Sequence, residues 1–588
     1  MPLHVRAAAL TLLIAGTLSP QTTPCACGVN PPGRPAAREL RPYAAAPDDM
    51  RPFSKFTTPH YEHYTNIVEY NGPGRDEPVP ALSTLDEIRI GFLGPLENHP
   101  DQALGQRMLN GVTLAIEEAN KAGGYCGKPF RLMLHNDQAV WGSASNEIVK
   151  MVYDEKVWAI FGSISGDSTH IALRVALKAE VPMVNSAATD PTIPETIIPW
   201  YLTVLQDDRV QSYTLARRIY TDLGLSRVAI LRINDRYGRF GVGKFKDASR
   251  RLGHPVVIEQ KYLYGDTDFA RQLRVIQDSR VDAVVLWGDA APAAAILKQM
   301  RSLGMKQRVF GSFRVLGPEL LEQAGDAAEG LEAVFPYDPT RAKDPLWQEF
   351  QARFKTRFHA APETFASLGY DAMKVLLDAI CRAGLNRAVI RDALTGLANY
   401  RGVTGEMTFD PNAKNIAPMY LAKVENRAVT YRRYPMDKPY ARSAEKPAEF
   451  NGPVVADAPK GALQVILFGP HPAPPRSQEG LAIIPVDSQT AWGKASSELV
   501  KLLYDERTIA IVATARDSSH LALQLGNKLH VPVIALSDDT SLTSMNLPWI
   551  LRMPAGTPVE EALRRLTDTL AKSGPNRERL ARLLTGAP

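Results

Sequence analysis

The sequence predicts an α/β protein built from parallel, doubly wound sheets, and two observations lead to this prediction. Short apolar runs that end in glycine or small polar residues, such as IRIGFLGP at 88–95, alternate with amphipathic stretches of helical length. This alternation is typical of parallel strands whose connecting helices cover both faces of a sheet. The segment VWGSASNEIVKMVYDE at 140–155 also returns as AWGKASSELVKLLYDE at 491–506, with ten of sixteen positions identical. One unit of the fold is therefore expected twice.

The first α/β unit, lobe one, is predicted to begin with the strand at 88–95, an apolar run that a Gly-Pro pair ends. Apolar residues then recur with helical period from Gly105 to Ala122, and the turn GGYCGKPF leads to a second strand, RLMLHND. The repeated helix follows, and after it come the strand VWAIFGS, a helix that starts near Asp167 and the strand VPMVNSA. Strand and helix alternate throughout, which favours a parallel sheet.

The alternation resumes with the strand SRVAILRIND at 226–235, the start of a second lobe. Helices are predicted over 238–252, 267–278 and 291–303, with strands between them, and a further helix covers 363–383. The predicted units are a signal peptide (1–24), a Pro-rich extended leader (25–85), lobe one (86–207 and 335–404), lobe two (208–334 and 405–436), a linker (437–462) and a degenerate half-lobe repeat (463–588).

The N-terminus has the pattern of a secretory signal peptide, because a basic start ending at Arg6 precedes the apolar stretch 7–18. That stretch is too short for a transmembrane helix, which needs about 20 apolar residues. The chain is therefore expected in the periplasm or otherwise exported. A lipid anchor at Cys25, which would attach the exported chain to a membrane, is an open alternative.

Two of the four cysteines, Cys126 and Cys381, lie within the predicted folded domains. An exported compartment permits disulfides. Cys126 follows the first helix and Cys381 ends the helix over 363–383, so both are expected at the end of lobe one away from the cleft. We predict that they bond to each other.

The tail repeats the strand pattern of lobe one: LQVILFGP parallels IRIGFLGP, and TIAIVAT stands for VWAIFGS. The copy is predicted to reach about Arg552 and to lack a counterpart of the first helix. Where lobe one has Ala188 and Thr189, the copy has Asp538 and Asp539. Two carboxylates repel an anionic ligand, so the tail is interpreted as a structural or docking module.

Composition and motifs exclude several classes of function. The net charge is +5, and no dense basic run supports nucleic-acid binding. The sequence contains no G-x-S-x-G, P-loop or H-E-x-x-H motif. His170 lies beside Asp167 and Ser168 on one short helix start, where capping explains the three residues better than a catalytic triad. Neither an enzymatic activity nor a cofactor is predicted.

Three polar loops follow strand ends, where ligands bind in open parallel sheets. They are GSISGDST, NSAATDP and INDRYGRFG. Their hydroxyl groups and backbone N–H groups can hold a carboxylate, although Ser168, Thr189 and Asp190 also suit helix caps and turns.

In combination, the motifs IGFLGP, SAATDP, NDRYGRFG, GDAAEG and GVTGEMTFDPN resemble the periplasmic solute-binding proteins of branched-chain amino acid and amide uptake systems, over about 86–436. The resemblance implies the type I binding-protein fold, with two lobes joined by three crossovers. It also implies that closing lobes trap a small organic acid or amino-acid-like solute, which is delivered to an ABC permease. A ligand-sensing receptor that uses the same fold is the alternative.

Carried over to this sequence, the resemblance places the ligand α-carboxylate at Gly166, Ala188 and Thr189, with Asp167 adjacent to Gly166. The family's acidic residue for the ligand ammonium is replaced by Phe313, which Arg314 follows. A carboxylate without an α-amino group is therefore predicted, unless Asp289 supplies the missing charge. The aromatic and apolar residues near the implied pocket are Tyr237, Trp287, Phe365 and Leu104.

Overall fold

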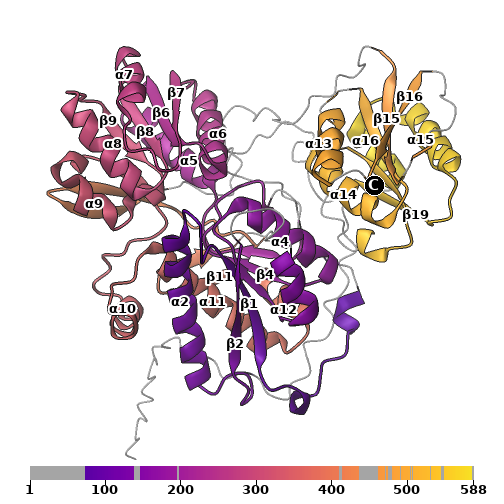
Figure 1. Ribbon diagram of the computed structural model, residues 1–588, viewed down its shortest axis with the longest axis horizontal. Helices are drawn as coiled ribbons and strands as arrows, with labels where there is room; N and C mark the ends of the chain where they lie inside the picture. The colour runs from indigo at the N-terminus through magenta and orange to yellow at the C-terminus, as the bar shows by residue number, and fades with distance from the viewer. Residues whose placement is uncertain are drawn as a thin grey trace, which may run out of the picture.

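The structure is a computed structural model that describes Cys25, Tyr70 and residues 73–585, apart from 138–145, 195–197, 410–412, 436–460 and short gaps between 471 and 548. The predicted signal peptide, most of the predicted leader and nearly all of the predicted linker lie outside the described residues. Figure 1 shows an α/β unit at the bottom, a second at the upper left and a third, yellow and orange, at the upper right.

Lobe one contains a parallel five-stranded sheet of order β2-β1-β3-β4-β5. Its strands are β1 (Ile88–Gly94), β2 (Phe130–Asn136), β3 (Ile160–Gly162), β4 (Met183–Asn185) and β5 (Tyr201–Thr203). Its helices are η2 (Pro73–Asp76), η3 (Leu82–Thr84), α2 (Gln102–Lys121), η4 (Lys150–Asp154), α4 (Gly166–Ala179), α10 (Pro345–Phe358), α11 (Thr364–Ala383) and α12 (Arg387–Thr395). Helices α2 and α11 pack closely at Gly111, where glycine is needed because it has no Cβ. A Cβ there would lie 1.9 Å from the carbonyl oxygen of Ala366.

Lobe two contains a seven-stranded sheet of order β14-β13-β10-β9-β8-β6-β7, in which β13 pairs antiparallel with β10 and β14. Its strands are β6 (Val228–Ile233), β7 (Ile258–Tyr262), β8 (Ala283–Trp287), β9 (Arg308–Gly311), β10 (Glu332–Phe335), β13 (Tyr420–Glu425) and β14 (Ala428–Arg433). Its helices are α5 (Asp208–Ala216), η6 (Arg217–Asp222), α6 (Arg236–Arg251), α7 (Ala270–Asp278), α8 (Ala290–Ser302), η7 (Phe313–Leu316), α9 (Glu319–Ala324) and η8 (Gly325–Ala328).

The chain passes between the lobes three times: from β5 to α5, from β10 to α10, and after the hairpin β11 (Asn399–Gly402) and β12 (Gly405–Thr408). Met407 and Phe409, just after the predicted boundary at 404, belong to a hydrophobic cluster that includes the core of lobe one and also Ala422 of lobe two. The first and third crossovers are tied together by the bridge between Thr203 and Lys414 and by an ion pair between Asp207 and Lys414, with N and O 3.5 Å apart.

The tail contains a parallel sheet of order β16-β15-β17-β18-β19, the same order of succession as in lobe one. Its elements are β15 (Leu463–Gly469), β16 (Leu481–Asp487), α13 (Trp492–Leu503), β17 (Thr508–Ala513), α14 (Arg516–Leu529), β18 (Val533–Leu536), η9 (Thr540–Thr543), β19 (Ile550–Met553), α15 (Val559–Ser573) and α16 (Arg577–Thr585). Residues 470–480 are the whole connection between β15 and β16, which leaves no room for a counterpart of the 20-residue helix α2.

The likeness between the tail and lobe one continues beyond Arg552, the predicted end of the copy. Arg387 at the start of α12 donates to the carbonyl oxygens of Val152 (3.4 Å) and Val157 (2.7 Å). Arg577 at the start of α16 donates to the carbonyl oxygens of Leu503 (3.5 Å) and Thr508 (2.8 Å), which occupy the corresponding positions. The shared letters GxNR…LTG at 384–396 and 574–586 carry this signal in the sequence.

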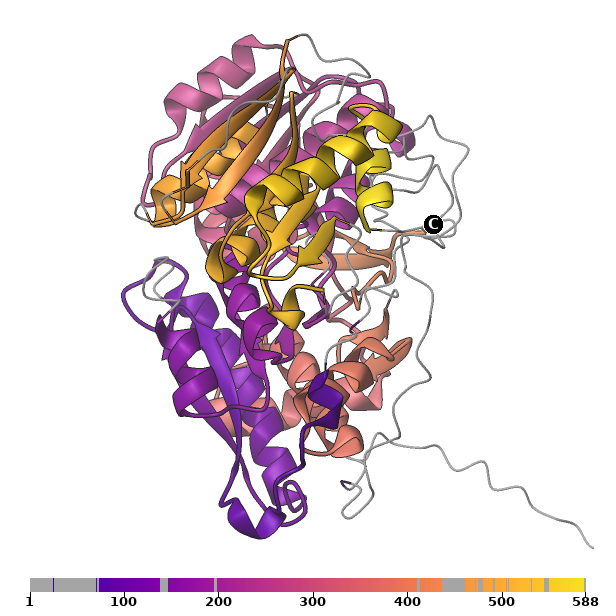
Figure 2. The ribbon, with the colours of Figure 1, turned by 90° about the vertical axis from the view of Figure 1, so that its right-hand side faces the viewer.

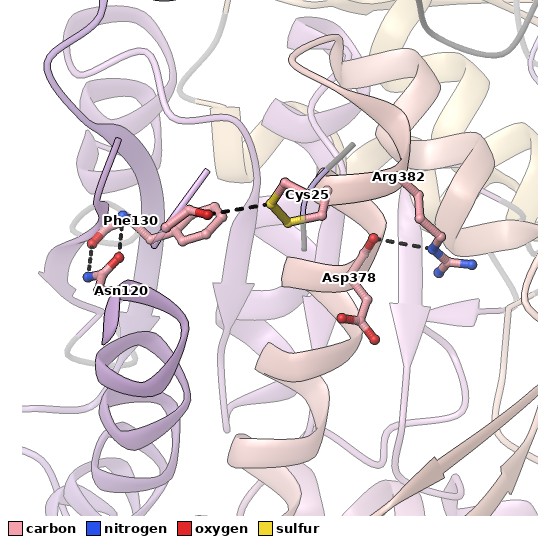
Figure 3. Close-up of a disulfide and its surroundings, with 7 residues drawn as sticks. Cys25, Asn120, Phe130, Asp378 and Arg382 are labelled. Atoms are coloured by element: carbon pink, nitrogen blue, oxygen red, sulfur yellow. Dashed lines mark hydrogen bonds between the residues drawn. A yellow bond between two sulfur atoms is a disulfide. The ribbon is translucent and has the colours of Figure 1, made fainter. Parts of the chain in front are cut away.

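The predicted disulfide between Cys126 and Cys381 is wrong, because Cys381 bonds to Cys25 instead (Figure 3). The bond ties the leader to the end of α11, and the Cys25 sulfur lies 3.6 Å from the carbonyl oxygen of Gly124. Cys126 is also disulfide-bonded, and none of the described cysteines is free. A sulfur in a disulfide cannot carry a lipid as well, so this structure is incompatible with a lipid anchor at Cys25.

We expect non-reducing peptide mapping of the exported protein to recover Cys25 linked to Cys381. Because the bond closes a loop of several hundred residues, Cys381→Ser should lower the free energy of unfolding by about 2–4 kcal/mol. Chemical denaturation with and without reductant measures this effect, and the wild type under reductant is the control. Recovery of a peptide that links Cys126 to Cys381 would contradict the expected pairing.

Candidate functional site

A cavity of about 440 Å³ lies between lobe one and lobe two. Lobe one contributes the start of α2 and the start of α11, and lobe two contributes the ends of β6, β7, β8 and β9 with the loops that follow them. The carboxyl ends of these parallel strands are where open α/β sheets bind ligands. Its charged and apolar lining residues include Asp101, Leu104, Arg107, Tyr262, Asp289, Phe313, Arg314, Glu319, Glu363 and Phe365.

Arg314 is the central charged group of the cavity wall, with a side chain that is 6% exposed. Its guanidinium donates to Asp289 Oδ1 at 2.7 Å in lobe two and to Asp101 Oδ1 at 3.0 Å in lobe one. It lies 4.5 Å from the ring centroid of Tyr237 and 6.0 Å from that of Phe365. Arg314 therefore faces inward and joins the two lobes across the cavity.

Burial and charge act in opposite directions on the titrating groups here. Burial raises the pKa of Asp289 to about 6, although the positive charge of Arg314 opposes the rise. Burial works to lower the pKa of Arg314, but the charges of Asp289 and Asp101 outweigh it and raise that pKa. Burial raises the pKa of Glu363 to about 7, against the hydrogen bond that the Ala366 N–H donates to it. Two of the acids in the wall thus take up protons close to neutral pH.

Aromatic and aliphatic side chains form the apolar part of the site. The rings of Phe313 and Phe365 lie 5.9 Å apart, one from each lobe, and both line the cavity together with Leu104. Tyr237 lies behind Arg314, and its ring centroid is 6.1 Å from that of Trp287. Trp287 is fully buried in the core of lobe two and does not line the cavity, contrary to the predicted pocket position.

The predicted carboxylate position is not part of this cavity. The Ala188 N–H donates to Asn185 Oδ1 at 2.8 Å, so it is already used within lobe one. Arg236 of lobe two donates to Asp190 (2.6 Å) and to Asp167 (3.1 Å). A Cβ at Gly166 would lie 3.1 Å from Arg236 Nε. An ion-pair network between the lobes therefore fills the space beside Gly166 and Asp167, and Thr189 is buried.

Comparisons with known proteins agree with this architecture. Residues 87–428 match the family model described as periplasmic binding protein. This chain belongs to the periplasmic binding protein family. It is 26% identical over 335 residues to the Leu/Ile/Val-binding protein homolog 2 of Brucella abortus (strain 2308), a match that covers 56% of this chain and 87% of the relative.

Solved structures give the same result for the fold of this periplasmic binding protein. The leucine binding protein LivK of Thermotoga maritima is 27% identical with a TM-score of 0.53, covering 59% of this chain and 97% of that protein. A solute binding protein of R. palustris in complex with benzoate is 17% identical with a TM-score of 0.54, covering 59% of this chain and 96% of that one, and it shows the shared fold alone. The relatives are binding proteins and not enzymes, as the sequence predicted.

Sequence reasoning missed a buried acid of this periplasmic binding protein at the first crossover. Asp208 is fully buried, and burial raises the pKa of its carboxyl well above the ordinary value, with the charges of Asp190 and Asp207 acting in the same direction. Burial raises the pKa of Tyr237, and the negative charge of Asp208 adds to the rise. Two consecutive acids in the segment LQDDRVQ, directly after an apolar strand, are the signal that could have found it. Thr189, Asp208 and Tyr237 thus form a polar group behind the cavity.

Across the residues that the structure describes, no three His, Cys, Asp or Glu side chains come together in a way that could hold a metal ion. No helix within the same residues is long and apolar enough to cross a membrane.

Proposed function

We propose that this protein is an exported substrate-binding protein of an ABC importer, which captures a small organic acid or amino-acid-like solute as the two lobes close. The observation that carries the proposal is the position of Arg314, which reaches from lobe two to Asp101 of lobe one along the wall of an apolar cavity. A cation held between two lobes is suited to report on closure around a ligand.

The polar group of the ligand is proposed to be a carboxylate or carbonyl that contacts Arg314. The resemblance to the family gives Phe313 the position of the acid that meets a ligand ammonium group, and the Asp289 carboxylate is paired with Arg314. A buried ammonium without a partner costs several kcal/mol. Phe313 and Phe365 suit an aliphatic or aromatic body, and the benzoate-bound R. palustris protein shows that one member of this fold takes an aromatic acid.

Calorimetry with matched pairs tests the ligand class: leucine against 4-methylpentanoate, and phenylalanine against 3-phenylpropanoate. We expect the acid without the amino group to bind more tightly in each pair. Tighter binding of the amino acids, abolished by Asp289→Ala, would refute the proposed class. A thermal-shift screen of carboxylates, amino acids and amides identifies the ligand, because a ligand that binds the native state alone raises apparent stability.

Ligand affinity is expected to depend on pH through Asp289. Above pH 6 this carboxyl is ionised in the free protein, and its charge repels a ligand carboxylate at Arg314. Binding then takes up a proton, so the affinity should fall by up to about tenfold per pH unit above 6 and level off below it. Calorimetry in a pH series measures this dependence. Asp289→Asn should flatten it, and an equally steep dependence in that variant would contradict the assignment.

A ligand-sensing receptor is the second candidate, and the tail favours it. Residues 437–588 lie outside the family match at 87–428, and they add a third α/β unit to a binding protein. Deletion of the gene distinguishes the two roles: an importer component is required for uptake of the ligand found by the screen. Unchanged uptake together with a lost transcriptional or chemotactic response would favour the receptor.

A further inference from the structure

The tail packs against lobe one through the helices of both units. One continuous cluster of buried apolar side chains runs from lobe one into the tail. Its members on facing helices include Ile148, Ile171, Leu173, Leu499, Leu521 and Leu525, with Val175 partly buried against them. In Figure 1, α14 lies above and to the right of α4, and the tail stands apart from lobe two. The tail therefore covers a face of lobe one that is built from α4 and the helix before β3.

The end of α4 lies beside the start of α14. Lys178 in the last turn of α4 lies 3.7 Å from Asp517 in the first turn of α14, measured from Nζ to Oδ1. An antiparallel pair of helices places the end of one beside the start of the other in this way.

The face of α4 that contacts the tail has a regular pattern. Asp167, Ile171, Val175 and Lys178 are spaced by four, four and three residues, so they lie on one side of the helix. The same spacing occurs in α14, with an acid at the start and two leucines in the middle. These residues are Asp517, Leu521 and Leu525.

Because the tail repeats lobe one, each helix meets a partner with its own pattern. A face with an acid at its start and a lysine at its end is complementary to a second copy of itself in an antiparallel pair. A two-fold interface requires that residue i contacts j and j contacts i, and the ion pair between Lys178 and Asp517 supplies one half of such a contact. Asp167 also accepts a hydrogen bond from Arg236, yet its side chain is 35% exposed.

We propose that the tail occupies, within the same chain, the face through which lobe one pairs with lobe one of a second copy. The tail is joined to the binding domain by one linker, and a tethered partner has a high effective concentration. It therefore outcompetes the second copy, and the full chain is monomeric while the tail is docked. Displacing the tail exposes the α4 face and allows a homodimer.

The test uses the full-length protein with Leu521→Asp and Leu525→Asp combined, which place two charges on the docking face of α14. These leucines are 7% and 8% exposed, and burying an unpaired carboxylate there is costly. Sedimentation equilibrium should give the mass of one chain for the wild type and twice that mass for the double variant. Limited proteolysis should show the tail of the variant cleaved from the binding domain faster than that of the wild type.

A third substitution supplies the matched control. Val175→Asp, added to the double variant, places a charge on the corresponding face of α4 and should return the protein to the mass of one chain. Three results would overturn the proposal: a wild type that is already dimeric, a double variant that stays monomeric whether or not its tail is released, or open-ended aggregation that Val175→Asp does not reverse. A two-fold interface closes at two copies, which is why aggregates count against it.

Discussion

Replacing Lys414 by methionine is expected to lower the free energy of unfolding by about 3–5 kcal/mol, because it leaves a buried carboxylate without its counter-charge. Lys414 is 1% exposed and Asp207 is 2% exposed, and their ion pair connects the third crossover to the first. Asp207 also caps α5 by accepting from the Arg209 and Val210 N–H groups. The loss should therefore affect the hinge and the start of α5 together.

Chemical denaturation of Lys414→Met and of the double variant Asp207→Asn/Lys414→Met measures the effect. Asparagine keeps an oxygen for the cap and removes the charge, so the double variant should recover most of the lost stability. The difference in the free energy of unfolding between the two variants gives the cost of the unpaired charge, because both variants lose the packing of Lys414. A single variant within 1 kcal/mol of the wild type, roughly the range of a surface substitution, would show that water reaches this pair.

The fold was predictable because its signals are local. The spacing of apolar residues and the turn residues beside them predict the strand at 88–95 and the repeated helix. The alternation of strands and helices then predicts the parallel sheets. The pair Phe313 and Arg314 was found in the same way, since it directly follows a strand end and departs from the family pattern. Residues at strand ends converge in any parallel sheet, so part of the site comes with the fold.

Contacts between lobes were not predictable, because they depend on side chains that are distant in sequence. Nothing local indicates that Arg236 of lobe two reaches Asp190 of lobe one. The predicted pairing of Cys126 with Cys381 was wrong for a related reason. Cys25 lies in a Pro-rich leader with no regular period, and no spacing rule places it beside Cys381.

Replacing Arg314 by glutamine is expected to weaken the binding of a carboxylate ligand by about 30- to 4,000-fold. Truncating one partner of a buried, hydrogen-bonded charge pair costs 2–5 kcal/mol, and each 1.4 kcal/mol is about tenfold in affinity. Arg314 meets these conditions because it is 8% exposed and bonds to both Asp289 and Asp101. Calorimetry with the ligand found by the thermal-shift screen measures the change.

The single variant alone cannot separate a lost ligand contact from a damaged wall, since it leaves Asp289 buried without a cation. Asp289→Asn/Arg314→Gln removes both charges and should restore stability but not binding. Arg107→Gln is the matched control, because Arg107 lines the same cavity and pairs with Glu319, away from the Arg314 network. If Arg314→Gln and Arg107→Gln weaken binding equally, the ligand carboxylate does not sit on Arg314. If the double variant binds as tightly as the wild type, Arg314 serves closure of the lobes rather than recognition of the ligand, since the anion then has its donors elsewhere.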